Sequence, residues 1–270
     1  TIIKAMTDTI SERGIYMRTK RIDEIEQYII QEKSVSLDTL CDVFQVSKNT
    51  IRRDIDTLAK TGKIKKVYGG VTLNETLPSK KLLPFAERHE KYMEEKKAIC
   101  RLAADHVKDG DIIYIDTGTT CHNLVDYISE KRCTIITNSL QVSLKALPYE
   151  NLTVISLPGY LKRETLSFVD VKIADYLKAF NIGKAFMACT GLSMENGLTN
   201  ASEEEYRVKE AVTANSMERF VLADHSKFGI FSLMTYCPLE KIHYILTDQP
   251  VPEEYEDFCS MNSITVETIG

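Results

Sequence analysis

The sequence lacks any apolar run that approaches the roughly 18 residues needed to span a bilayer. A secretory signal is also missing, because the first residues mix Lys4, Asp8, Glu12 and Arg13 with few apolar side chains. No internal repeat or disordered stretch is evident. These absences exclude a membrane-spanning or repeat protein, so we expect a cytoplasmic protein with no membrane partner.

Signatures of metal binding and of disulfide frameworks are missing too. No two cysteines form a C-x-x-C pair, and no histidines form an H-E-x-x-H motif. We therefore expect reduced, mostly buried thiols, no metal and no cofactor. The residues concerned are Cys41, Cys100, Cys121, Cys133, Cys189, Cys237 and Cys259, and His89, His106, His122, His225 and His243.

Length and charge fit one large or two modest domains. The chain has 270 residues and a formal net charge of -5, which is not typical of a nucleic-acid-binding protein. The charge is unevenly distributed, however, because residues 17–73 hold 11 Lys and Arg against 8 Asp and Glu. A basic segment on an acidic body is compatible with DNA binding.

Residues 35–71 carry the pattern of a helix-turn-helix. Apolar side chains at helical spacing mark a first helix at residues 37–44 and a second at residues 51–58. Ser47 lies between them, where its hydroxyl can cap the second helix. Behind the second helix, residues 63–68 alternate as a strand that ends at a pair of glycines. We expect a winged helix-turn-helix.

The polar face of the second helix carries amide, hydroxyl, ammonium and guanidinium donors, the groups that reach phosphates and base edges in a major groove. A basic wing beside it would add phosphate contacts. The alternative is a solvated charged helix followed by a surface hairpin. The predicted DNA-binding residues are Ser36, Ser47, Lys48, Asn49, Thr50, Arg52, Arg53, Lys65, Lys66, Tyr68, Gly69 and Gly70.

We divide the chain into four parts: 1–16 without assignment, 17–74 the winged module, 75–91 a linker and 92–270 an effector and oligomerisation domain. The linker is inferred from Thr76, Pro78, Ser79 and Pro84, which should interrupt any helix there. Helical periodicity returns over residues 92–107.

The last part alternates strands and helices, which predicts a parallel sheet covered on both faces. Ligands should then bind at the carboxyl ends of the strands. Strands are expected at 111–116, 134–137, 152–157, 184–189, 219–223, 242–247 and 264–269, and helices at 122–129, 140–147, 173–180, 203–215 and 253–261.

Glycines, hydroxyls and charges follow several of these strands. A glycine with neighbouring threonines that runs into a helix N-terminus could hold an anion such as a sugar phosphate, although a simple capped turn would look alike. Lysine and arginine nearby could neutralise a phosphate. The predicted effector-binding residues are Asp116, Thr117, Gly118, Thr119, Thr120, Thr137, Asn138, Ser139, Gly159, Lys162, Arg163, Thr190, Gly191, Glu205, Asp224, Ser226 and Lys227.

The motifs VSKNTIRRDIDTL and KVYGGV resemble the signature of the DeoR family of bacterial repressors. DTGTT at residues 116–120, TNS at 137–139, EYRVK at 205–209 and DHSKFG at 224–229 also match its pattern. The resemblance implies a ribose-phosphate-isomerase-like parallel α/β effector domain that senses sugar phosphates. Pro158-Gly159 departs from the pattern, because members often have two glycines there.

Within the family, CDVFQVSKNTIRRDI and LADHSKF are most similar to repressors of myo-inositol catabolism. That similarity implies a phosphorylated keto-sugar-acid as effector and double-stranded operator DNA as partner. It does not tell whether the effector releases or strengthens DNA binding.

Two other functions remain open from the residues alone. Asp116, Glu205 and Lys227 could serve as acid and base groups of a sugar-phosphate isomerase fused to a DNA-binding module. Alternatively, the second domain could only oligomerise. A homodimer or homotetramer is expected in either case, since two reading heads match two half-sites. Our main hypothesis is a repressor without enzymatic activity.

Overall fold

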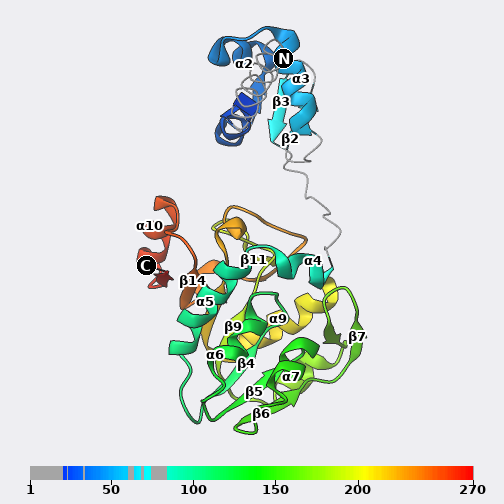
Figure 1. The fold of residues 1–270 in the computed structure, drawn as a ribbon, viewed down its shortest axis with the longest axis vertical. Helices are drawn as coiled ribbons and strands as arrows, with labels where there is room; N and C mark the ends of the chain where they lie inside the picture. The colour runs from blue at the N-terminus through cyan, green and yellow to red at the C-terminus, as the bar shows by residue number, and fades with distance from the viewer. Residues whose placement is uncertain are drawn as a thin grey trace, which may run out of the picture. The chain divides into compact units, whose positions relative to one another are not determined.

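The structure is a computed structural model that describes residues 21–22, 24–32, 34–59, 64–67, 70–73 and 84–269. The chain forms two compact units, divided between Pro78 and Ser79 (Figure 1). No helix in the described ranges has the length and apolar character needed to cross a membrane. We describe each unit by itself.

The first unit contains the predicted helix-turn-helix. Residues 24–32 are helical, and α2 (Leu37–Phe44) and α3 (Lys48–Ala59) follow. Helix α2 ends at Gln45, which has the left-handed φ of 50° and turns the chain toward α3. The side chains that pack the three helices together are Ile25, Ile29, Leu40, Ile51, Ile55 and Leu58. The apolar spacing of the sequence therefore corresponds to a buried core.

A three-stranded sheet completes the unit. Strands β2 (Ile64–Val67) and β3 (Gly70–Leu73) form the antiparallel wing, and β1 (Ser34–Ser36) pairs with the other edge of β3. Strand β1 was not predicted, because three residues carry too little pattern. A Cβ on Gly70 would lie 2.5 Å from the carbonyl oxygen of Val35, so this position requires glycine.

The second unit is built on a seven-stranded parallel sheet, which confirms the α/β prediction. The strand order is β15-β14-β12-β9-β4-β5-β6. All six pairings within this sheet are parallel. The strands are β4 (Ile112–Ile115), β5 (Cys133–Thr137), β6 (Leu152–Ser156), β9 (Ile182–Met187), β12 (Ser216–Leu222), β14 (Tyr244–Thr247) and β15 (Thr265–Thr268).

Helices lie on both faces of this sheet (Figure 1). One core contains α5 (Met93–Asp105), α6 (Leu124–Tyr127) and α7 (Leu140–Ala146). The opposite core contains α8 (Ile173–Leu177), α9 (Glu203–Asn215) and α10 (Glu253–Met261). Successive residues of β4 serve the two cores in turn, because side chains of a strand alternate between its faces.

The order in which the chain adds strands to the sheet reverses between β4 and β9. From β4 the chain proceeds outward through β5 and β6, and it then returns to place β9 on the other side of β4. In open parallel sheets, such a switch point leaves a crevice at the carboxyl ends of the two strands. The loops after β4 and β9 are therefore where a ligand would bind.

The structure corrects the extent of the linker. Residues 75–91 were expected to be a linker without a helix, but α4 (Phe85–Glu90) lies within them, and Phe85 is buried. Pro84 precedes this helix instead of interrupting it, since proline is compatible with a helix start. Thr76, Pro78 and Ser79 lie outside the described residues.

Several short elements were also not predicted. The second unit adds a hairpin of β7 (Tyr160–Lys162) and β8 (Ser167–Val169). A small antiparallel sheet contains β10 (Gly191–Ser193), β11 (Gly197–Asn200) and β13 (Met234–Cys237). The helix expected at 122–129 is a 3-10 turn, η1 (Cys121–Asn123), followed by the single turn of α6. All seven cysteines are free and five are buried, as predicted.

Candidate functional site

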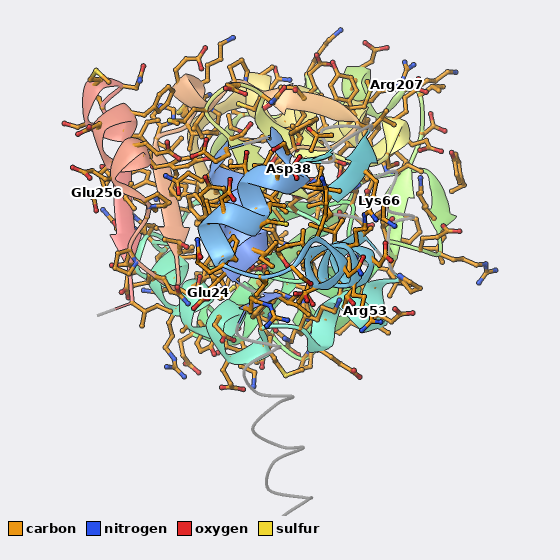
Figure 2. All side chains as sticks on the ribbon, turned by 90° about the horizontal axis from the view of Figure 1, so that it is seen from above. Glu24, Asp38, Arg53, Lys66, Arg207 and Glu256 are labelled. Carbon is orange, nitrogen blue, oxygen red and sulfur yellow. The ribbon has the colours of Figure 1, made fainter. Side chains whose placement is uncertain are left out.

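Helix α3 presents a basic face. The Oγ of Ser47 accepts a hydrogen bond from the amide of Thr50 at 3.3 Å, so Ser47 is the predicted cap. The side chains of Lys48, Asn49, Arg52 and Arg53 are exposed on this helix. Figure 2 shows Arg53 on α3 and Lys66 on the wing. The helix periodicity thus separates a core face from a face that is free to meet DNA.

Two predicted DNA-binding lysines are ion-paired within the unit. Lys48 Nζ lies 2.5 Å from Asp38 Oδ1, and Lys66 pairs with Asp56. All four side chains are substantially exposed, so these pairs add little stability and can exchange for phosphate. In the described ranges, neither Arg52 nor Arg53 has an ion-pair partner.

Among the remaining predicted DNA-binding residues, Ser36 and Gly70 have structural roles. Ser36 caps α2 by accepting the amide hydrogen of Thr39 at 3.0 Å. Lys65 lies in β2, and its side chain is not described, whereas Tyr68 and Gly69 fall outside the described residues. Gly70 has the structural role given above. DNA contact by these residues stays a prediction.

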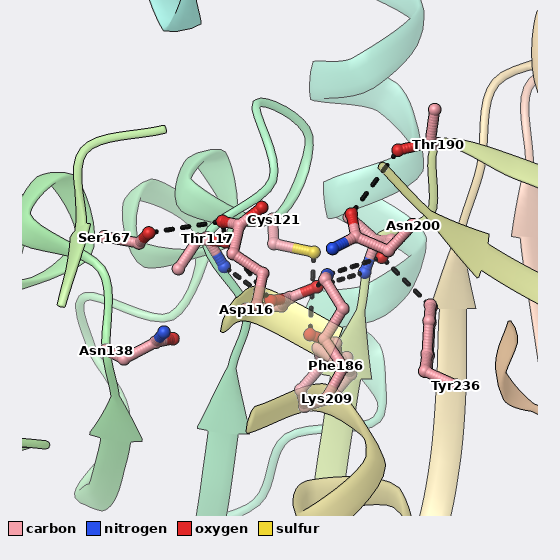
Figure 3. Close-up of polar contacts among 12 residues, drawn as sticks. Asp116, Thr117, Cys121, Asn138, Ser167, Phe186, Thr190, Asn200, Lys209 and Tyr236 are labelled. Carbon is pink, nitrogen blue, oxygen red and sulfur yellow. Dashed lines mark hydrogen bonds and ion pairs between the residues drawn. The ribbon is translucent and has the colours of Figure 1, made fainter. Parts of the chain in front are cut away.

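A buried ion pair occupies the switch point of the second unit. The ammonium of Lys209 on α9 pairs with Asp116 Oδ2 directly after β4, and it also donates to the Ala188 carbonyl at 2.8 Å (Figure 3). The Ala188 amide donates to the same Asp116 oxygen at 2.8 Å. Burial alone would lower the pKa of Lys209, but Asp116 and Glu205 outweigh burial and raise it.

The loop after β4 continues this network. Thr117 Oγ1 and Ser167 Oγ each donate to Glu205 Oε1 at 3.2 Å (Figure 3). A Cβ on Gly118 would lie 2.2 Å from the Cβ of Ala188, so only glycine lets the two loops approach this closely. In the described part of the chain, no acceptor pairs with the amides of Gly118, Thr119 and Thr120.

Those three amides are the donors that an oxyanion would need. The expected helix N-terminus is reduced to the 3-10 turn η1, so the loop amides, more than a helix dipole, would hold the anion. The prediction of an anion cradle at residues 116–120 remains a prediction with this changed geometry.

The loop after β5 is engaged in local structure. Thr137 Oγ1 donates to the Ile115 carbonyl at 2.7 Å, and Ser139 Oγ caps α7. Asn138 bridges Tyr114 and Phe168 through its amide group at 2.7 and 3.0 Å. These side chains fix the edge of the sheet, and a direct contact with a ligand stays a prediction.

The second group of predicted residues surrounds α9. Lys162 donates to Ser202 Oγ and Glu204 Oε2, both at 2.8 Å, and Ser202 Oγ donates to Glu204 Oε2 at 2.7 Å. The hydrogen bonds that Glu204 accepts from Lys162 and Ser202 lower its pKa to about 2. Arg163 is exposed. Gly159 has a φ of 146° and no room for a Cβ beside Val169. Position 159 therefore requires glycine for steric reasons, although the preceding residue is Pro158 and not the second glycine of the family pattern.

Thr190 and Gly191 follow β9. Thr190 Oγ1 donates to Asn200 Oδ1 at 3.4 Å. A Cβ on Gly191 would lie 2.3 Å from the carbonyl oxygen of Ile230. Close backbone approach explains this glycine, and its contact with a ligand stays a prediction.

The loop after β12 holds the remaining predicted residues. Asp224 is buried, and its Oδ1 accepts the amide of Ser226 at 3.1 Å and the Ser226 hydroxyl, while Lys227 is half-buried. His225 has Nδ1 2.6 Å from Asp248 Oδ2. His225 follows β12 and Asp248 follows β14, and these neighbouring parallel strands end side by side. The sequence did not predict this contact, because the two residues are 23 positions apart.

Three basic residues at this edge were not predicted. Lys209 follows Glu205 by four residues, a spacing that places both on one helix face, so the sequence did contain a signal for it. Arg88 lies on α4, near enough to Glu205 and Asp116 for both to act on it electrostatically. Lys96 on α5 is 3% exposed. Arg88 had no sequence signal because α4 was assigned to the linker. Lys96 had none because nothing local distinguishes it from the exposed Lys97 on the same predicted helix. No group of three possible metal ligands occurs among the described residues.

Known proteins resemble both units. Residues 21–77 match the family described as DeoR-like helix-turn-helix domain, and residues 91–249 match DeoR C terminal sensor domain. The HTH-type transcriptional regulator IolR of Bacillus subtilis is 41% identical over 93% of this chain and 99% of its own. The lactose phosphotransferase system repressor of Staphylococcus epidermidis is 30% identical over 87% of this chain and 94% of its own.

Among solved structures, ribose 5-phosphate isomerase A of Methanocaldococcus jannaschii resembles half of the chain. It covers 50% of this chain and 54% of its own, at 20% identity and a TM-score of 0.38. This partial similarity says nothing about ligand or reaction. The two domain matches and the relatives over nearly the whole chain establish that this protein belongs to the DeoR family of transcriptional repressors.

Proposed function

We propose that this repressor binds operator DNA through α3 and the wing, and that a phosphorylated sugar or sugar acid bound at the β4–β9 switch point releases it. The observation that carries the effector site is the loop 116–120, where three amides without acceptors adjoin the buried Asp116–Lys209 pair. Amides supply anion contacts, and Thr117 and Glu205 supply hydroxyl contacts. The resemblance to repressors of myo-inositol catabolism favours a phosphorylated keto-sugar-acid.

The site geometry favours binding over turnover. An isomerase needs a carboxylate that can remove a proton from substrate. Asp116 Oδ2 already accepts from Lys209 and Ala188, and Asp116 Oδ1 accepts from Thr117. Glu205 Oε1 accepts two hydroxyls. We therefore propose no enzymatic activity, and an effector incubated with the protein should be recovered unchanged in its NMR spectrum.

We also infer a homodimer or homotetramer, because two symmetric half-sites on DNA require two modules at a fixed spacing. Light scattering after size exclusion measures the assembly directly. A monomer at micromolar concentration would contradict this inference.

The deciding experiment follows the anisotropy of labelled DNA from upstream of the protein's own gene cluster. Salt is held constant, because phosphate contacts make the affinity steeply dependent on it. A panel of sugar phosphates and inositol breakdown intermediates is then added. Tight binding that one compound reverses is the expected result. Binding that no compound changes would contradict the sensing proposal, and a compound that is consumed would indicate an enzyme.

A further inference from the structure

Lys96 is a buried cation without a carboxylate partner in the described residues. It lies near the start of α5 and is 3% exposed. The acceptor of its ammonium is the main-chain carbonyl of Arg88, at 2.5 Å. Burial lowers the pKa of Lys96 to about 8. Buried ammonium groups are normally neutralised by a charge or by several acceptors, so an anion would compensate the charge at this position.

The loop after β12 lies beside the start of α5, since the rings of Tyr92, which precedes α5, and His225 in the loop have centroids 4.9 Å apart. Asp224 and Lys227 are both close enough to act on the Lys96 ammonium electrostatically, with opposite signs. Asp224 is 0% exposed, and no donor among the described residues contacts its Oδ2. A buried carboxylate oxygen without a donor is uncommon in folded proteins and marks a place where a donor from outside the chain can bind.

We propose that Lys96 and Lys227, together with Asp224, form a second ligand position of the effector site, which binds an oxyanion that carries a neighbouring hydroxyl. The two ammonium groups contact the oxyanion, and Asp224 Oδ2 accepts the hydroxyl. The oxyanion is a phosphate or a carboxylate. This inference rests on the proposed function.

The order of the strands allows one ligand to contact both this second position and the amides of residues 118–120. Strand β12 pairs with β9, and β9 pairs with β4, so the loops after all three strands share one edge of the sheet. A ligand held by the amides of residues 118–120 at one end therefore meets Lys96 and Lys227 at the other. Asp224 disfavours an anion that brings no hydroxyl of its own, which selects a polyhydroxylated compound.

Lys96 also connects the ligand to α4. Its ammonium donates to the carbonyl of Arg88 and has two further N–H groups that can bind an oxyanion, so this one residue contacts both α4 and the proposed ligand.

The test uses the full-length protein with two probes, D-glucose 6-phosphate for the phosphate and D-gluconate for the carboxylate. Calorimetry measures their affinity, and anisotropy of operator DNA measures release. Lys96→Met should weaken the recognised probe at least about tenfold, the loss expected for one charge-assisted hydrogen bond. Lys227→Met tests the position from the other loop and should have a similar effect. The probe that loses affinity identifies the oxyanion.

Lys97→Met is the matched control. It removes the same charge from the next residue of α5, where Lys97 is 38% exposed and pairs with Glu94, and it should leave both affinities unchanged. If Lys96→Met and Lys227→Met bind both probes as the wild type does, this second position is wrong, while wild-type binding and DNA release in the same titrations would preserve the proposed function. A wild type that binds neither probe at millimolar concentration overturns this second position, and the panel of sugar phosphates and inositol breakdown intermediates then tests the proposed function separately.

Discussion

Lys209 on α9 and Asp116 after β4, 93 residues apart in the chain, form an ion pair that solvent hardly reaches. Their side chains are 5% and 1% exposed. The pair connects the middle of α9, on one face of the sheet, to the loop at the switch point. It also holds Ala188, directly after β9, through two further hydrogen bonds. The pair thus anchors the loop at which we propose that the effector binds.

We expect Lys209→Met to destabilise the second unit by about 3–5 kcal/mol, because it leaves the Asp116 carboxylate buried without its cation. Urea unfolding measures the change. Lys178→Met is the control, since Lys178 pairs with Asp175 at the surface with both groups exposed, and its loss should remain within about 0.5 kcal/mol. Equal effects of the two variants would contradict the role given to the buried pair.

Arg52→Ala and Arg53→Ala should each weaken operator binding about 10- to 100-fold, since a base or phosphate contact of arginine contributes about 1–3 kcal/mol. Anisotropy at fixed salt measures the loss, and affinity for the two effector probes should not change. Arg207→Ala is the control, because Arg207 lies exposed on α9 and pairs with Glu203 (Figure 2). Loss of both activities would indicate misfolding instead.

Asp54→Asn should destabilise the first unit by about 1–3 kcal/mol. Asp54 lies on the inner face of α3, is 1% exposed, and accepts a hydrogen bond from Arg21 Nε at 2.9 Å. The substitution weakens the link between α3 and Arg21, which lies in the helical residues before α2. Hydrogen exchange of α3 amides measures it, and Asp42→Asn, at an exposed position of the same unit, should leave exchange unchanged.

The lowered pKa of Lys96 predicts a pH dependence of stability. Between about pH 8 and the ordinary lysine value of 10.5, the unfolded chain holds this proton and the folded chain does not. The free energy of unfolding therefore rises with pH in that window, by as much as about 3 kcal/mol relative to Lys96→Met. The groups that act on Lys96 are Asp224, Lys227, Arg88 and Glu95.

Urea unfolding of wild type and Lys96→Met from pH 7 to pH 10.5 measures this difference. Lys97→Met should follow the wild-type curve, because Lys97 is exposed. A constant difference between wild type and Lys96→Met across the window would mean that the folded protein keeps Lys96 protonated. Because only the ammonium binds an oxyanion, affinity for the recognised probe should also fall above about pH 8.

The sequence predicted elements best where one periodicity persisted. Helices α9 and α10 span the predicted residues 203–215 and 253–261, and each predicted strand overlaps a strand of the parallel sheet. The three-residue strands and α4 were not predicted, because so few residues carry no periodicity and because Pro84 looks the same whether it interrupts a helix or begins one.

The residues of the candidate site likewise include some that the sequence indicated and some that it did not. Asp116 and Asp224 were expected at this edge because they follow strands, and parallel strands end at one edge. Glu205, within α9, was named from its acid chemistry and from the motif EYRVK. Arg88, Lys96 and Lys209 were missed, because their role depends on what they meet across the fold. Nothing local distinguishes Lys96 from its exposed neighbour Lys97.

The sequence by itself therefore determined the two units, the helix-turn-helix, the alternating α/β order and the family, because these depend on local periodicity and on short motifs. Only the tertiary structure decided which charges are buried together at the switch point. Burial and electrostatic partnership are set by segments far apart in the chain, as with Lys209 and Asp116, and no local pattern contains them.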